Sequence, residues 1–226
     1  DLSAFSLEGR TIMVTGANTG IGQGISVAIA RAGGRVFGVG RSDMSETASL
    51  IGEAFTPILC DLSDLDAARA MLAAASSVVF LDGLVNNAGI IRRADATDFS
   101  EDDWDAVLNV NLRTVFFLSQ AYGKLVLSAG RTGKIVNIAS LLSLQGGIRV
   151  PAYTASKHGV AGITQALSNE WAARGINVNA IAPGYIESNN TSALRADPDR
   201  SAAILSRIPA GRWGQPSDIG DAAVFL

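Results

Sequence analysis

Three residues in the middle of the chain have side chains that together could move a proton: Ser140, Tyr153 and Lys157. Tyr153 and Lys157 are four residues apart, so on a helix they share one face, with Cβ atoms about 5–6 Å apart. Pro151 suits the first turn of such a helix. Ser140 directly follows an apolar, β-prone run over residues 134–139. We therefore expect the three side chains to converge at the carboxyl edge of a sheet, where open α/β folds bind ligands.

This arrangement would permit general acid–base catalysis by Tyr153. A free phenol has a pKa of about 10 and is a poor base at neutral pH. The Lys157 ammonium and a cationic ligand ring would both favour the phenolate, and lowering the pKa by about 3 units requires roughly 4 kcal/mol. Tyr153 could then take a proton from an alcohol while hydride leaves its carbon, and Ser140 could hydrogen-bond the developing alkoxide. The same Tyr–Lys spacing is also typical of an ordinary amphipathic helix, so the rest of the chain must decide.

Composition limits the classes of protein to which the chain can belong. It has 226 residues, of which 48% are hydrophobic and 17% charged, as expected for one globular domain over residues 1–226. The net charge is −3 without a basic block, which argues against nucleic-acid binding. We find no apolar run long enough to span a membrane and no signal peptide, so we expect a cytoplasmic protein with no membrane partner.

The chain has one cysteine and one histidine, which excludes several kinds of catalytic and structural site. Cys60 is the only cysteine, so the chain cannot form an internal disulfide. His158 is the only histidine, which excludes a Ser/His/Asp triad elsewhere and makes a zinc site improbable. We therefore predict no metal.

A glycine-rich turn near the start of the chain indicates phosphate binding. Residues 10–15 form an apolar, β-prone run, and residues 21–32 have helical spacing. Between them the turn has the pattern Gly-x3-Gly-x-Gly, in the context required of a dinucleotide-binding motif. Phosphate oxygens would meet the helix N-terminus. The glycines would allow the tight turn, the close approach of the backbone to the pyrophosphate, and the packing of the helix on the strand. The turn residues expected to hold the cofactor are Gly16, Asn18, Thr19, Gly20, Ile21 and Gly22.

The end of the second predicted strand, residues 35–40, bears on the choice of cofactor. An acidic residue that binds the ribose of NAD is expected there, but Arg41 stands in its place. Arg41 could bind a 2′-phosphate or stack on adenine. Asp43 comes late for the ribose role, and we interpret it as an N-cap of the next helix.

Further predicted strands end in residues that could line the same edge of the sheet. Asp61 and Leu62 follow a strand at 57–60, and we expect Ser63 to cap the next helix. The strand and turn over residues 84–89 bring Asn87, Ala88 and Gly89, where Asn87 could tie neighbouring loops together.

A long helix is predicted from Ser100 to about Ser128. Asn111 within it could support a water chain to Lys157, or it could simply be solvated. Gly146 and Gly147 are expected to form a tight loop before the helix at Pro151.

The last part of the chain completes the pattern. Residues 176–181 form a sixth strand, followed by Pro183 and Gly184. Residues 185–207 are polar and could cover a substrate.

Taken together, these ordered elements resemble the classical short-chain dehydrogenase/reductase family over nearly the whole chain. The resemblance implies an α/β, doubly wound parallel-sheet Rossmann fold, NAD(H) or NADP(H) as cofactor, and a catalytic tetrad of Asn111, Ser140, Tyr153 and Lys157. Lys157 would also hold the nicotinamide ribose, and Ser188 would contact the carboxamide. The cofactor-binding residues implied beyond the glycine turn are Arg41, Asp61, Leu62, Asn87, Ala88, Gly89, Tyr153, Lys157, Pro183, Gly184, Ile186 and Ser188.

Four longer segments, at residues 86–93, 145–153, 184–191 and 207–213, resemble one subgroup of that family. Its members are the 2-deoxy-D-gluconate 3-dehydrogenases, also called 2-dehydro-3-deoxy-D-gluconate 5-dehydrogenases. The resemblance implies a sugar-acid substrate and weakly favours NAD, although Arg41 leaves NADP open.

A sugar acid carries a carboxylate, which arginine binds well. We expect its contacts to be Arg93, Ser140, Gln145, Arg149, Tyr153 and Asn190. Each arginine could instead be a solvated charge or a subunit contact.

Two alternative functions remain open, and there are two further structural expectations. The alternatives are reduction of a 3-oxoacyl thioester and a catalytically silent nucleotide-binding scaffold. The family resemblance also implies a homotetramer, and the last strand typical of the family is absent from the sequence.

Overall fold

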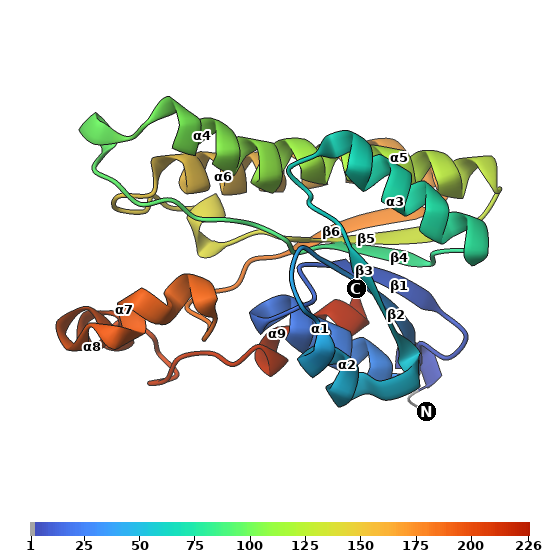
Figure 1. The fold of residues 1–226 in the computed structure, drawn as a ribbon, viewed down its shortest axis with the longest axis horizontal. Helices are drawn as coiled ribbons and strands as arrows, with labels where there is room; N and C mark the ends of the chain where they lie inside the picture. Colours follow the sequence, from blue (N-terminus) through green and yellow to red (C-terminus); the bar gives the residue numbers. More distant parts are fainter. Residues whose placement is uncertain (1–2) are drawn as a thin grey trace.

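A parallel sheet is the centre of the fold in a computed structural model, which describes residues 3–226 apart from the side chains of Ala4 and Asn190. Within that range six strands pair in the order β3-β2-β1-β4-β5-β6 (Figure 1). They are β1 (Thr11–Thr15), β2 (Arg35–Gly40), β3 (Phe55–Leu59), β4 (Gly83–Asn86), β5 (Gly133–Ile138) and β6 (Ile176–Ile181). The order reverses between β1 and β4, so the predicted doubly wound Rossmann fold is confirmed.

Helices cover both faces of the sheet (Figure 1). One face carries α1 (Gly20–Arg31), α2 (Ser45–Ile51) and α9 (Ser217–Phe225). The other carries α3 (Leu65–Val78), α4 (Glu101–Leu108), α5 (Thr114–Ser128) and α6 (Pro151–Trp171). The short helices α7 (Ser192–Ala196) and α8 (Pro198–Leu205) extend to one side, on the left in Figure 1. None of the helices within residues 3–226 is both long and apolar enough to cross a membrane.

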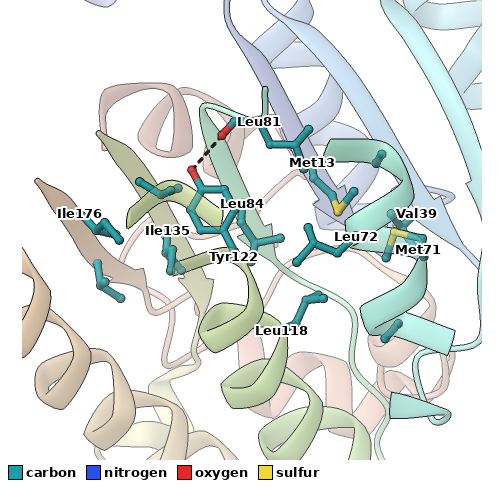
Figure 2. Packing of buried hydrophobic residues seen from close by; sticks show 14 of the residues in the cluster. Met13, Val39, Met71, Leu72, Leu81, Leu84, Leu118, Tyr122, Ile135 and Ile176 are labelled. Atoms are coloured by element: carbon teal, nitrogen blue, oxygen red, sulfur yellow. Dashed lines mark hydrogen bonds between the residues drawn. The ribbon is translucent and has the colours of Figure 1, made fainter. Parts of the chain in front are cut away.

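Each face of the sheet has its own hydrophobic core. Tyr122 is almost wholly buried in the core under α3, α5 and α6, and its hydroxyl donates to the carbonyl of Leu81 at 3.2 Å (Figure 2). Burial raises the pKa of this phenol well above its usual range. Ile25 and Ile29 of α1 belong to the opposite core. Because both faces are covered, the central strands are apolar on both sides, as the sequence predicted for β1.

The helix predicted from Ser100 to Ser128 is interrupted. A π-helical turn, Asn109–Arg113, separates α4 from α5 and contains Asn111, which is 1% exposed. Such turns insert one extra residue into a helix and are frequent at functional sites. No local pattern in the sequence indicates this turn.

Two predicted helix caps were wrong. Asp64, and not Ser63, caps α3, since its carboxylate accepts from the backbone N–H groups of Asp66 and Ala67 at 3.0 Å each. Asp43 does not cap α2, because it precedes the N-cap position and its carboxylate accepts from the N–H of Ser45. The third strand also begins two residues earlier than the predicted residues 57–60.

Candidate active site

A cleft of about 430 Å³ opens at the carboxyl edge of the sheet. This volume lies within the range of about 300–1,000 Å³ that is usual for ligand sites. The cleft has two parts. The first, which we call the glycine end, comprises residues 16–22, 41, 61–62 and 87–89. The second, which we call the loop end, consists of the loops over residues 90–95, 140–150 and 185–191. Of these residues only 90–92, 140, 186, 188–189 and 191 line the cleft itself.

Close backbone approach requires glycine at the glycine end. Gly16 has φ +68°, which suits the turn out of β1. A Cβ on Gly22 would lie 2.1 Å from the carbonyl oxygen of Gly16 and 2.5 Å from Nδ2 of Asn87. Gly22 therefore lets α1 pack against the turn, as predicted, although it does not itself line the cleft.

The N-terminus of α1 faces the cleft without a side-chain cap. Thr19 occupies the N-cap position and makes no capping hydrogen bond, and the cleft is lined by Thr19, Gly20 and Ile21. The first N–H groups of a helix lack partners within it, and the helix dipole there favours negative charge. This end of the cleft therefore fits a phosphate group.

Asn87 joins the loops after β1 and β4, as the sequence predicted. Its Nδ2 donates to the carbonyls of Thr15 at 2.9 Å and Gly16 at 3.3 Å. In return, the Thr15 hydroxyl accepts from the N–H groups of Asn87 and Ala88 at 2.9 and 3.0 Å. These bonds hold the floor of the glycine end rigid.

The outer part of the glycine end carries one positive and one negative side chain. Arg41 and Asp61 both line the cleft. Hydrogen bonds from Ser63, helped by the charge of Arg41, hold the pKa of Asp61 below its usual range. Asp43 is bonded to Ser45 and does not line the cleft, so it is not placed for a ribose.

The structure brings almost every predicted cofactor residue to this cleft. Those that line it are Gly16, Asn18, Thr19, Gly20, Ile21, Arg41, Asp61, Leu62, Asn87, Ala88, Gly89, Tyr153, Lys157, Pro183, Gly184, Ile186 and Ser188. Ser188 also approaches the turn directly, since a Cβ on Gly20 would lie 3.2 Å from its Cβ. The segment after β6 therefore lies over the start of α1.

Ser140 and Tyr153 meet at the boundary between the two ends of the cleft. Ser140 is held by a short 3₁₀ helix, Leu141–Ser143, in which its hydroxyl oxygen accepts from the N–H of Leu142 at 3.1 Å. Its side chain also hydrogen-bonds the phenol of Tyr153. Burial raises the pKa of Tyr153, and the Ser140 bond and the positive charge of Arg93 oppose that rise. The protein environment thus keeps the phenol neutral at neutral pH.

Lys157 lies beneath Tyr153 in the protein interior. Its ammonium is 5.5 Å from the centre of the Tyr153 ring and donates to the carbonyl of Ile138 at 2.5 Å. Burial lowers the pKa of Lys157 to about 8. We expected Lys157 to lower the pKa of Tyr153, but Ser140 and Arg93 are the groups that do so here.

Ser143 positions this trio, although the sequence analysis did not single it out. Its hydroxyl donates to the carbonyl of Lys157 at 2.6 Å and accepts from the N–H of Ser140 at 3.3 Å. The Ser-x-x-Ser spacing of Ser140 and Ser143 is a capping-box pattern that could have predicted it.

Asn111 lies behind the cleft and does not line it. Its side chain exchanges two hydrogen bonds with the backbone of Ile90, each 2.8 Å long, and its Nδ2 lies 3.4 Å from the Ser156 hydroxyl. Ser156 donates in turn to the carbonyl of Tyr153 at 2.7 Å. Asn111 therefore connects the loop after β4 to the helix that carries Tyr153 and Lys157.

The remaining predicted substrate residues lie outside the cleft lining. Arg93 is exposed as a residue, but its charge acts on Tyr153. Partial desolvation of its guanidinium, together with the charge of Arg200, lowers the pKa of Arg93. Gln145 and Arg149 are exposed and do not line the cleft. The side chain of Asn190 lies outside the described part of the chain. Arg92, which was not predicted, lines the cleft and pairs with Asp103 at 3.0 Å.

No metal site accompanies these residues, since none of the described His, Cys, Asp and Glu residues gather in a group of three or more that could hold an ion.

The fold and this cleft define a nucleotide-dependent oxidoreductase architecture, and the chain belongs to the short-chain dehydrogenase family, whose model matches residues 10–199. It is 54% identical over 229 residues to 2-dehydro-3-deoxy-D-gluconate 5-dehydrogenase of Escherichia coli, covering 100% of this chain and 90% of that relative. Identity to the enzyme of the same name from Bacillus subtilis is 56%, covering 99% and 89%. A solved structure of a candidate 2-deoxy-D-gluconate 3-dehydrogenase from Agrobacterium tumefaciens, with bound NADP, is 60% identical with a TM-score of 0.94, covering 99% and 90%.

Proposed function

We propose that this enzyme is an NADP-dependent dehydrogenase that interconverts a secondary alcohol and a ketone of a sugar acid, of the 2-dehydro-3-deoxy-D-gluconate type. The observation that carries the proposal is the Ser140–Tyr153–Lys157 trio in a cleft where the charge of Arg93 acts on Tyr153. The names of relatives that share more than half of their residues with this chain support the substrate class.

The cleft fits a dinucleotide in its own geometry. The uncapped start of α1 would bind the pyrophosphate, and Gly22 allows the close packing behind it. Lys157 and Tyr153 line the opposite part of the cleft and would hold the nicotinamide ribose. When bound, the nicotinamide accepts or supplies the hydride.

The chain's own residues would handle the proton. In oxidation, Tyr153 would accept the proton of the substrate hydroxyl as its C–H bond breaks, and in reduction it would return a proton to the carbonyl oxygen. Ser140 would hydrogen-bond that oxygen. Lys157, whose ammonium lies 5.5 Å from the centre of the Tyr153 ring, would favour a phenolate that develops during the reaction, although it does not lower the pKa of the resting phenol.

Arg93 supplies the argument for an acidic substrate. It follows β4 by a few residues, and its charge acts on the Tyr153 phenol. A guanidinium binds a carboxylate through two parallel hydrogen bonds. We propose that Arg93 binds the substrate carboxylate while the reacting oxygen lies against Tyr153 and Ser140.

Arg41 supports NADP, although the subgroup resemblance weakly favoured NAD. It lines the cleft at the end of β2, while Asp43 is bonded to Ser45. A guanidinium at that position suits a 2′-phosphate better than a free ribose diol. The bound NADP of the Agrobacterium tumefaciens protein agrees with this choice.

The test is turnover of 2-dehydro-3-deoxy-D-gluconate, followed by nicotinamide absorbance with NADH and NADPH in parallel. We expect turnover with NADPH at a higher kcat/KM than with NADH. Higher kcat/KM with NADH would overturn the role of Arg41 and leave the reaction intact. No turnover with either, on protein that still binds NADPH, would overturn the sugar-acid assignment.

A further inference from the structure

Arg149 has a backbone conformation that side chains rarely adopt. Its φ is +63°, and it is the only non-glycine residue with positive φ in the described part of the chain. The nearby Gly146 and Gly147, which we expected to form the tight loop, do not have positive φ. A left-handed conformation strains any residue with a Cβ, and such strain persists only where surrounding contacts hold it.

Two contacts hold Arg149 to the loop after β4. Its Nε lies 2.9 Å from Oδ1 of Asp95, and its carbonyl oxygen accepts from the N–H of Ala94 at 3.2 Å. Both side chains of the ion pair are more than half exposed. An exposed ion pair stabilises a fold only slightly, so these contacts are a weak reason to keep a strained arginine for stability alone.

The two joined segments carry the two groups that the proposed function requires. Ala94 directly follows Arg93, the proposed carboxylate ligand. Arg149 is followed by Val150, which is buried and precedes α6, and then by Tyr153 within the first turn of that helix. The Arg149 contacts therefore join the segment that carries the Arg93 guanidinium to the segment that carries the Tyr153 phenol.

The position of Arg149 argues against a direct role in binding. Its guanidinium already faces the Asp95 carboxylate, with Nε 2.9 Å from Oδ1. A substrate carboxylate in the same place would be repelled by Asp95.

We propose that Arg149 is a positioning residue, which together with Asp95 braces the loop of Arg93 against the start of α6 and so fixes the spacing between Arg93 and Tyr153. This spacing would match the distance between the carboxylate and the reacting carbon of the substrate. The expected effect on KM for the sugar acid rests on the proposed function. The contacts of Arg149 with Asp95 and Ala94 can be tested without it.

A double-mutant cycle tests the brace. Arg149→Gly removes the side chain and tolerates the positive φ, so the fold is expected to persist. Asp95→Asn removes the partner charge. If the two residues act only as a pair, each single variant raises KM for the sugar acid by roughly tenfold. This is less than the roughly hundredfold loss that a ~1 Å misplacement of a functional group can cause. We expect a smaller effect on kcat, and the double variant is expected to be no worse than either single one.

One further measurement, with a control variant, separates the possible failures. Amide hydrogen exchange at Ala94 is expected to accelerate in both single variants, which tests the brace without any substrate. The control is Arg69→Ala, which breaks the exposed Arg69–Asp66 pair on α3 and is expected to change neither readout.

Unchanged exchange at Ala94 would overturn the brace. A large loss in Arg149→Gly beside an unaffected Asp95→Asn would overturn it as well, because Arg149 would then be a substrate ligand. If wild-type protein shows no sugar-acid turnover, the proposed function fails, and the exchange measurement still decides whether the brace exists.

Discussion

The two ends of the cleft are built by different means. At the glycine end, the position of the backbone is set by contacts that leave no room for a side chain, as at Gly22, and by the Asn87 bonds to Thr15 and Gly16. At the loop end, exposed ion pairs hold the loops in place. Arg149–Asp95 connects two irregular segments, and Arg92–Asp103 connects the loop after β4 to α4. The first kind of contact tolerates little change, whereas the second can be altered without unfolding the core.

This difference fits a division of labour. A cofactor common to many enzymes needs a site that does not vary, and buried backbone contacts provide it. A substrate that differs between enzymes needs side chains that can be exchanged, and exposed loops provide them. Tyr153 stands at the boundary, so its removal tests whether the two ends can be separated.

Tyr153→Phe is expected to have the largest effect. It removes the proton donor and acceptor while keeping the ring over Lys157, so kcat should fall by about 10²–10⁴-fold or more. NADPH affinity, measured by fluorescence titration, should change little because the glycine end is intact. Tyr185→Phe is the matched control, since the ring of Tyr185 packs edge-on against Trp213 outside the cleft lining. Retained turnover in Tyr153→Phe would show that another group carries the proton.

Gly22→Ala is expected to have the next largest effect, and it acts on the glycine end. The added methyl group would meet the carbonyl of Gly16 at 2.1 Å, and backbone cannot move aside as a side chain can. We expect a loss of about 1–3 kcal/mol in the free energy of unfolding, together with weaker NADPH binding. Urea unfolding measures the first quantity.

Gly162→Ala is the matched control for that loss. Gly162 lies within α6, where an added Cβ would meet nothing within 4 Å, so alanine should be neutral or stabilising. Equal stability of the Gly22→Ala and Gly162→Ala proteins would contradict the view that the glycine end is rigidly packed.

Arg41→Ala is expected to have the smallest effect. The side chain is exposed, and its loss removes one charged contact to a 2′-phosphate, so KM for NADPH should rise roughly tenfold. KM for NADH should stay nearly constant because NADH lacks that phosphate. Parallel steady-state kinetics with both cofactors measure the ratio. An equal rise in both values would place Arg41 against adenine instead of the phosphate.

The sequence predicted the glycine end well because its causes are local. Gly16 and Gly22 stand at a spacing typical of a strand–turn–helix unit. At the boundary between the two ends the cause is local as well, because Tyr153 and Lys157 share a helix face. The loop end was harder to predict. The direction of the Arg149 side chain depends on the left-handed backbone conformation of Arg149 itself. From the sequence, Gly146 and Gly147 were better candidates for that conformation. Its partner Asp95 is distant in sequence, and no local pattern connects the two.

The π-helical turn around Asn111 has a consequence for the whole upper layer of helices. One inserted residue rotates everything after it by about 100° around the helix axis. α4 can therefore face α6, while Tyr122 and Leu118 of α5 point into the core between this helix layer and the sheet. A chain one residue shorter at this point could form an unbroken α-helix, but it would have to turn one of these two faces toward water. The turn thus changes the rotational phase of the helix. One continuous stretch of chain can therefore pack α4 against α6 and α5 against the sheet, although regular helical periodicity would not direct both faces inward.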